Sequence, residues 1–159
     1  MQYTQSTTIV EKELAMVLLS VIVEYFTNEI IEQYYSQLNP IIEDYLRSDQ
    51  PGLKKLSVET VNKLATTSDA VKVLKKYNTL IPLVVNALDG DADEELTAKV
   101  FETFNEFVDY KKVLGPSLLA IIEKAMVIAA NQDLGNNLRG ETMYFLGSIT
   151  GPYSKSLIK

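Results

Sequence analysis

Apolar side chains recur along most of the chain at three- and four-residue spacings, which is the spacing of one face of an α-helix. The clearest example is a single broad apolar stripe made by Leu96, Val100, Phe101, Phe104, Phe107 and Val108. Strand-like alternation of apolar and polar residues is not sustained anywhere in the sequence. The pattern therefore predicts an all-α protein.

Clusters of helix-breaking residues divide the chain at 48–52, 89–91, 115–116 and 133–137. Between them the periodicity predicts seven helices, over 7–26, 31–47, 52–66, 69–88, 92–110, 116–131 and 136–149. Pro51 and Pro116 stand where helices are expected to begin, a position that proline tolerates.

Two other prolines, Pro40 and Pro82, fall inside predicted helices, so we expect kinks there. After Ile149 the pair Gly151-Pro152 predicts that the chain leaves the last helix.

Two motifs repeat along the chain. Residues 38–46 align with 80–88 at an offset of 42, and a third copy beginning at Leu118 has alanine in place of the proline. Residues 58–64 align with 101–107 at an offset of 43, with Glu, Thr and Asn identical and every apolar position conserved in character. A looser third copy fills its apolar positions with Met143, Leu146 and Ile149. Each repeat is thus expected to be a pair of helices.

A helix pair that recurs about every 42 residues resembles the HEAT and armadillo repeats, whose period is about 40–47 residues. The resemblance implies an α-solenoid of HEAT-type antiparallel helix hairpins. We expect one segment over 1–159, made of the second helix of a partial repeat (7–26) and of the repeats 31–66, 69–110 and 116–149. The first helix is apolar almost all round between Leu14 and Val23, as expected of a fragment of a longer solenoid.

The composition excludes several kinds of catalytic and metal-binding site. The chain has no cysteine and no histidine, which excludes disulfides, ordinary zinc sites and histidine-based catalytic triads. It has no glycine-rich phosphate loop, and paired carboxylates on an open solenoid lack an enclosing pocket. We therefore expect a protein that is not an enzyme and has no cofactor. If it were an enzyme, its catalysis would have to rest on carboxylates.

Charge and hydropathy limit the partners. A net charge of −6 disfavours direct nucleic-acid binding, which requires phosphate neutralisation. The apolar stretch 14–23 is too short to span a bilayer, and no secretory signal is visible, so we expect no membrane insertion.

The runs 80–88, 100–107 and 128–139, with Leu118 between them, resemble importin-β (karyopherin-β) receptors, and are most similar to the N-terminal third of the ribosomal-protein and histone importers. The resemblance implies a nuclear transport receptor that shuttles between cytoplasm and nucleus. Its implied partners are basic cargo and Ran GTPase on the concave, second-helix face, and Phe-Gly nucleoporins on the outer, first-helix face. The alternative is a HEAT scaffold of another assembly, such as a phosphatase subunit or a trafficking adaptor.

The segment 89–109 holds eight acidic residues and one basic residue, Lys99. Such an acidic surface is expected to attract basic peptides, although a solvated helix face with acids near its N-terminus has the same composition. The candidate protein-binding residues of the concave face are Glu59, Asn62, Glu95, Glu102, Asn105 and Glu106. The two asparagines recur at equivalent positions, and plain solvent exposure is the favoured interpretation for them.

Two further sets of residues have predicted places. Tyrosines on the first helices would either line an outer groove for nucleoporin Phe residues or belong to the core; they are Tyr34, Tyr35, Tyr45 and Tyr77. The apolar residues expected to be buried between neighbouring helices are Val61, Leu64, Phe104 and Phe107.

Overall fold

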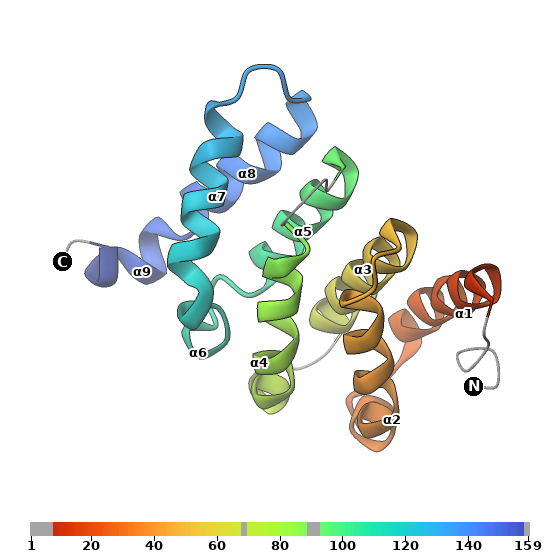
Figure 1. Cartoon of the computed structure of the whole chain (residues 1–159). Helices are drawn as coiled ribbons and strands as arrows, with labels where there is room; N and C mark the ends of the chain where they lie inside the picture. Colours follow the sequence, from red (N-terminus) through yellow and green to blue (C-terminus); the bar gives the residue numbers. More distant parts are fainter. Residues whose placement is uncertain (1–7, 68–69, 89–92, 158–159) are drawn as a thin grey trace. The chain divides into compact units, whose positions relative to one another are not determined.

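The computed structural model describes residues 8–67, 70–88 and 93–157. Within these ranges every regular element is helical and there is no strand, so the predicted all-α class is confirmed (Figure 1). The chain divides into two compact units, Met1–Val73 and Leu74–Lys159, and the boundary falls inside the helix α4.

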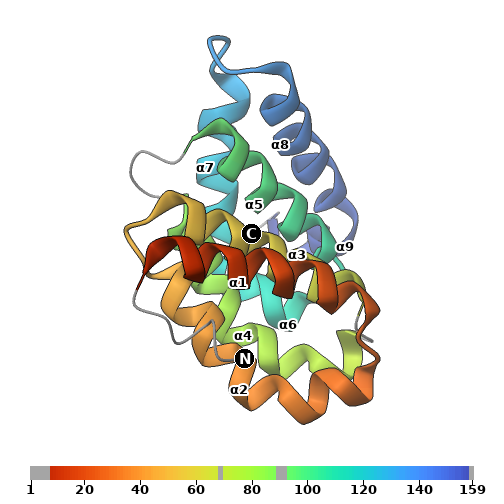
Figure 2. The same ribbon diagram turned by 90° about the vertical axis from the view of Figure 1, so that its right-hand side faces the viewer.

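The described part of the first unit contains three whole helices and the first residues of α4. Helix α1 (Ile9–Ile22) is extended by a 3-10 turn (Val23–Tyr25), and α2 (Asn28–Leu46) and α3 (Pro51–Thr67) follow. Helix α2 begins where the Thr27 hydroxyl accepts a hydrogen bond from the Ile30 N–H, as an N-cap does. Helix α3 packs against both α1 and α2, as Figure 2 shows.

The core of the first unit is apolar and comes from all three helices. Its fully buried side chains include Met16, Val23, Ile31, Leu38, Ile42, Val58, Val61 and Leu64. Because α3 contributes the last three, this helix is the centre of the unit.

The second unit contains most of α4 (Ala70–Asn86) and five later helices. These are α5 (Glu94–Glu106), the short α6 (Lys111–Leu114), α7 (Leu118–Ala130), α8 (Asn136–Ser148) and α9 (Thr150–Leu157). Helix α8 packs against α5, α7 and α9, so it occupies in this unit the place that α3 occupies in the first.

Three phenylalanines form the centre of the second unit. The ring of Phe104 meets that of Phe101 edge to face at 5.7 Å between centroids, and Phe145 of α8 lies 5.7 Å from Phe101 and 6.0 Å from Phe104. All three are fully buried. The prediction that Val61, Leu64, Phe104 and Phe107 are buried is confirmed, since none exposes more than 2% of its surface.

The buried polar residues of the described chain lie on four of its helices. They all belong to α1, α3, α5 or α8, and they are Ser20, Ser57, Thr60, Asn62, Thr97, Thr103 and Thr142. The serine and threonine hydroxyls among them bond to backbone carbonyls three or four residues earlier; Thr60 donates to the Leu56 carbonyl at 2.7 Å, and Thr142 donates to the Leu138 carbonyl at 2.7 Å. Such back-bonded hydroxyls can be buried without a partner on another helix.

Several predicted boundaries are wrong at the helix ends. The predicted helix 92–110 stops at Glu106, because Phe107 has a non-helical backbone (φ −107°, ψ 3°) that turns the chain toward α6. Pro116 lies in a 3-10 turn, Gly115–Ser117, and α7 begins only at Leu118.

The tail does not leave the helical state after Ile149. Helix α9 starts at Thr150 and carries Pro152 in its first turn, where the missing N–H has no intrahelical partner to lose. By contrast, Pro51 begins α3 as predicted, and Pro40 and Pro82 lie inside α2 and α4.

By length and composition, one segment of the described chain, Lys111–Ala130, is apolar enough to cross a membrane. In the structure it is not one continuous α-helix, because the turn at Gly115–Ser117 separates α6 from α7. The 13 residues of α7 span about 20 Å, less than the roughly 30 Å of a bilayer's hydrocarbon core.

Candidate functional site

The N-terminal end of α5 concentrates acidic residues that hold the structure together. The Asp93 carboxylate accepts a hydrogen bond from the Leu96 N–H at 2.6 Å and so caps the helix. The Glu94 carboxylate reaches across to α8 and accepts from the Gly135 N–H at 2.9 Å. These two acids therefore have structural partners, while Asp89 and Asp91 lie outside the described residues.

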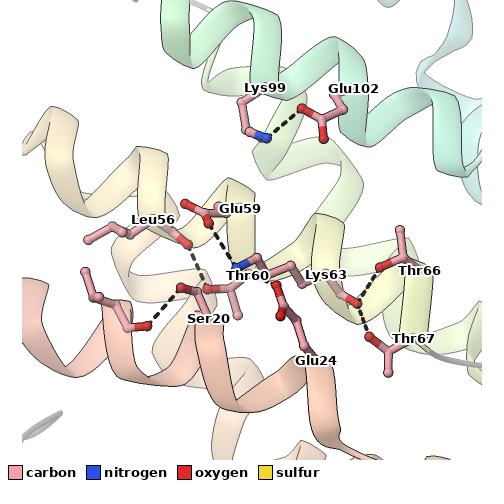
Figure 3. A network of polar contacts seen from close by, with 11 residues as sticks. Ser20, Glu24, Leu56, Glu59, Thr60, Lys63, Thr66, Thr67, Lys99 and Glu102 are labelled. Atoms are coloured by element: carbon pink, nitrogen blue, oxygen red, sulfur yellow. Dashed lines mark hydrogen bonds and ion pairs between the residues drawn. The ribbon is translucent and has the colours of Figure 1, made fainter.

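The three acidic candidates on α5, Glu95, Glu102 and Glu106, reach the surface. Glu95 and Glu106 are exposed, and the Glu102 side chain keeps 45% of its surface in solvent. Glu102 is nevertheless paired with Lys99, whose ammonium lies 2.6 Å from its carboxylate (Figure 3). Part of the negative charge counted in the sequence is thus neutralised locally.

Glu106 has a carboxyl group whose affinity for protons is changed by its surroundings. Partial burial raises the pKa of Glu106 above its ordinary value of 4.5, and the nearby Glu102 carboxylate raises it further. Both effects disfavour the charged form, the first by loss of hydration and the second by repulsion one helical turn away.

Replacing Glu106 with glutamine is expected to stabilise the protein at neutral pH. The folded state has the higher pKa, so the wild type loses stability as pH rises from the ordinary carboxyl pKa through the raised one. Burial of the charged carboxylate is the larger cause of the expected gain at pH 7, and the repulsion between like charges four residues apart on a helix adds roughly 0.2–0.5 kcal/mol to it. Thermal unfolding of both proteins from pH 3 to pH 7 measures it. A variant advantage that persists unchanged at pH 3 would contradict this origin.

The remaining candidates of the predicted concave face lie on α3 and at the end of α5. Asn62 exposes only 8% of its surface, and its Nδ2 has no hydrogen-bond partner, so the predicted solvent exposure is wrong for this residue. Asn105 is half-buried and accepts a hydrogen bond from the Ser148 hydroxyl of α8 at 3.3 Å. The two equivalent asparagines therefore have different environments, and neither is a freely exposed amide.

Glu59 belongs to an ion-pair network inside the first unit. The Lys63 ammonium lies 3.1 Å from the Glu59 carboxylate and 2.8 Å from that of Glu24, which follows α1 (Figure 3). The hydrogen bond to Glu24 is the main reason that the pKa of Lys63 is raised. Glu59 thus helps to tie α3 to the end of α1 instead of presenting an unpaired charge.

A groove beside α7 is a site that the sequence reasoning missed. It is an open depression of about 320 Å³, and its lining residues are Leu88, Glu123, Lys124, Val127 and Ile128. Val127 is apolar but 71% exposed, so the groove offers solvent-accessible apolar surface. The one signal in the sequence was the strongly apolar composition of 118–130, which exceeds what a single buried helix face needs.

The tyrosines of the first helices, expected either in an outer groove or in the core, lie in different environments. Tyr45 is 3% exposed, with the Lys12 ammonium 5.6 Å from its ring centre, so it is a core residue. Tyr35 is half-buried and donates a hydrogen bond to Asn39 at 2.6 Å, whereas Tyr34 is 38% exposed. The Tyr77 side chain lies outside the described residues.

Comparison of the chain with models of known protein families gives no match, and comparison with curated proteins gives no significant relative. Conclusions about function therefore rest on the acidic surface of α5, on the groove beside α7 and on the way the helices pair.

Proposed function

We propose that this chain is part of a HEAT-type α-solenoid that binds other proteins, in the manner of a nuclear transport receptor. The observation that carries the proposal is the set of contacts made by α3 and α8. Helix α3 packs against α2, the helix before it, and also against α1. Helix α8 packs in the same way against α7, the helix before it, and also against α5. Stacked helix pairs with these contacts are what repeat solenoids use to build a continuous core and extended binding surfaces.

The exposed acids of α5 support basic segments as the cargo. Glu95 and Glu106 are exposed, and Glu102 is half exposed beside its lysine. Glu106 and Asp109 also lie at the C-terminal end of the helix, where the backbone carbonyls add negative potential. A surface of this kind attracts Lys- and Arg-rich peptides and accelerates their association.

The groove beside α7 supports a second contact, with Phe-Gly segments of nucleoporins. It lies on the first-helix side, between α7 and the residues that follow α4, and its apolar lining and volume suit one aromatic side chain. Ran GTPase completes the proposed set of partners, and the proposed location is the cytoplasm and the nucleus.

A HEAT scaffold of another assembly remains the second candidate, because its helices pair in the same way. Binding to Ran that requires GTP separates the two: a transport receptor is expected to retain Ran in its GTP form, and a phosphatase or trafficking scaffold is not.

The cargo surface is tested by a triple substitution, Glu95/Glu102/Glu106→Gln. At low salt we expect the variant to bind an arginine- and lysine-rich peptide about tenfold more weakly, mainly through slower association. The difference should shrink near 1 M salt, where the Debye length falls to about 3 Å. Titration by calorimetry and stopped-flow association rates measure both effects.

A matched control carries the same change in net charge on the other unit. Glu32, Asp44 and Asp49 are exposed acids of the first unit, and their change to the corresponding amides removes three charges away from α5. Equal weakening by the two triple variants would mean that net charge alone matters. Equal affinity of all three proteins would leave the acids of α5 as a solubility feature.

A further inference from the structure

In each unit a glutamate of one helix lies against a glycine at the start of another. In the first unit the Glu13 carboxylate of α1 occupies the space that a Cβ atom on Gly52 would take, in the first turn of α3. In the second unit the Glu94 carboxylate of α5 lies 2.6 Å from the place of a Cβ on Gly135, the residue before α8. Since α1 packs against α3 as α5 packs against α8, the same contact occurs in both units.

The start of a helix is a favourable place for a carboxylate. The first N–H groups of a helix have no partner inside it, and together they carry a partial positive charge. Gly135 uses its N–H directly and donates a hydrogen bond to the Glu94 carboxylate at 2.9 Å. At the start of α3 the Glu13 carboxylate faces the same partial charge. Each contact therefore combines the charge of a side chain with the dipole of the neighbouring helix.

The two glycines provide room for the carboxylates. Neither needs to be glycine for its backbone: Gly52 lies within α3, and Gly135 has φ −59° and ψ 148°, which any residue can adopt. A Cβ atom at either position would displace the glutamate, whereas a Cβ on Gly140 or Gly147 of α8 would meet nothing within 4 Å. The absence of a side chain at positions 52 and 135 is thus what lets a carboxylate approach the backbone.

We propose that these glutamate–glycine pairs are clasps that fix the position of α3 along α1 and of α8 along α5. Apolar contacts between similar helices are non-directional and permit more than one register. A clasp forms only where an acid on one helix meets a glycine at the start of another, so it selects one pairing and one register. The clasps are independent of the proposed binding surfaces, because neither Glu13 nor Glu94 belongs to the candidate binding residues.

The clasp of the first unit is tested by a double-mutant cycle on Glu13 and Gly52. In the Glu13→Ala background, Gly52→Ala should raise the ratio of folded to unfolded protein about two- to fivefold, as alanine does in place of a helical glycine. With Glu13 present, the added Cβ pushes the carboxylate away from the helix start, and no gain is expected. Urea denaturation of the four proteins measures the ratios. An equal gain in both backgrounds would overturn the proposal.

The matched control is Gly140→Ala, at a helical glycine where an added Cβ meets nothing within 4 Å. It should raise the ratio of folded to unfolded protein about two- to fivefold whether or not Glu13 is present. A gain at position 140 that depended on Glu13 as strongly as the gain at position 52 would also overturn the proposal, because the dependence would then not arise from contact.

The clasp of the second unit is tested by nuclear magnetic resonance and hydrogen exchange. Because the Gly135 N–H donates to Glu94, its chemical shift should follow the protonation of that carboxylate, and Glu94→Gln should abolish this dependence. Asp133→Asn, a charge change two residues away, should leave it intact. In Glu94→Ala the amides of the first turn of α8 should exchange about tenfold faster. A Gly135 signal that titrates unchanged in Glu94→Gln, or unaltered exchange in Glu94→Ala, would contradict the clasp.

Discussion

Phe104→Ala is expected to lower the free energy of unfolding by about 3–5 kcal/mol. Phe104 is fully buried, and its ring lies in van der Waals range of both Phe101 and Phe145, so its removal leaves a cavity between α5 and α8. Loss of two aromatic contacts adds to the loss of buried apolar surface. Urea denaturation followed by far-ultraviolet circular dichroism measures the change.

The control for this experiment is Leu119→Ala, at a position 73% exposed on α7. Its effect should stay within about 0.5 kcal/mol, as for most surface substitutions. If Phe104→Ala cost less than about 1 kcal/mol, α5 would not be oriented with this face toward α8.

Asn62→Leu is expected to raise the free energy of unfolding by about 1–3 kcal/mol. The amide Nδ2 of Asn62 is buried and has no hydrogen-bond partner, so folding removes it from water without compensation. Leucine has nearly the same shape and no polar atom to desolvate. Thermal and urea unfolding of the two proteins, compared at the same concentration, give the difference.

Asn105→Leu provides the matched comparison at the equivalent position of α5. Asn105 accepts a hydrogen bond from Ser148, so its replacement removes a partner and is expected to destabilise the protein. A gain at position 105 and a loss at position 62 would reverse the expected order and show that the polar contacts of the two asparagines have been assigned wrongly.

The helices could be predicted because each has an apolar stripe of helical period. The stripe around Phe104 predicts that this residue and Phe107 lie in the core, and both are fully buried. The same reasoning failed at Asn62, because periodicity describes one helix at a time. Which helix covers the polar edge of a stripe depends on residues far away in the sequence.

Local signals were also misleading where proline and glycine occur at a helix start. The pair Gly151-Pro152 predicts the end of the helical region, yet α9 begins one residue before this pair, at Thr150. Proline breaks a helix from the inside but fits its first turn, and the sequence alone does not distinguish the two positions.

The sequence predicts which charged residues belong to the candidate site, but it does not predict which of them pair with one another. Composition identified the acidic segment, whereas the capping of α5 by Asp93 and the ion pair between Lys99 and Glu102 depend on side-chain geometry. The groove beside α7 could not be predicted from the sequence for a related reason. It combines Leu88 with Val127, which are separated by two helices in the chain and form no contiguous motif.

The hydroxyls that bond within their own helix have a mechanical consequence. Thr60 and Thr142 carry their hydrogen bonds with them when α3 or α8 moves, so sliding one helix along its neighbour does not break these bonds. The link between α3 and the end of α1 is an ion pair, Lys63 with Glu24, whose energy changes gradually with distance. Apolar contacts are likewise non-directional. In the first unit, sliding α3 along α1 should therefore meet a gradual resistance, whereas in the second unit the hydrogen bonds from Gly135 to Glu94 and from Ser148 to Asn105 would have to break before α8 could slide along α5.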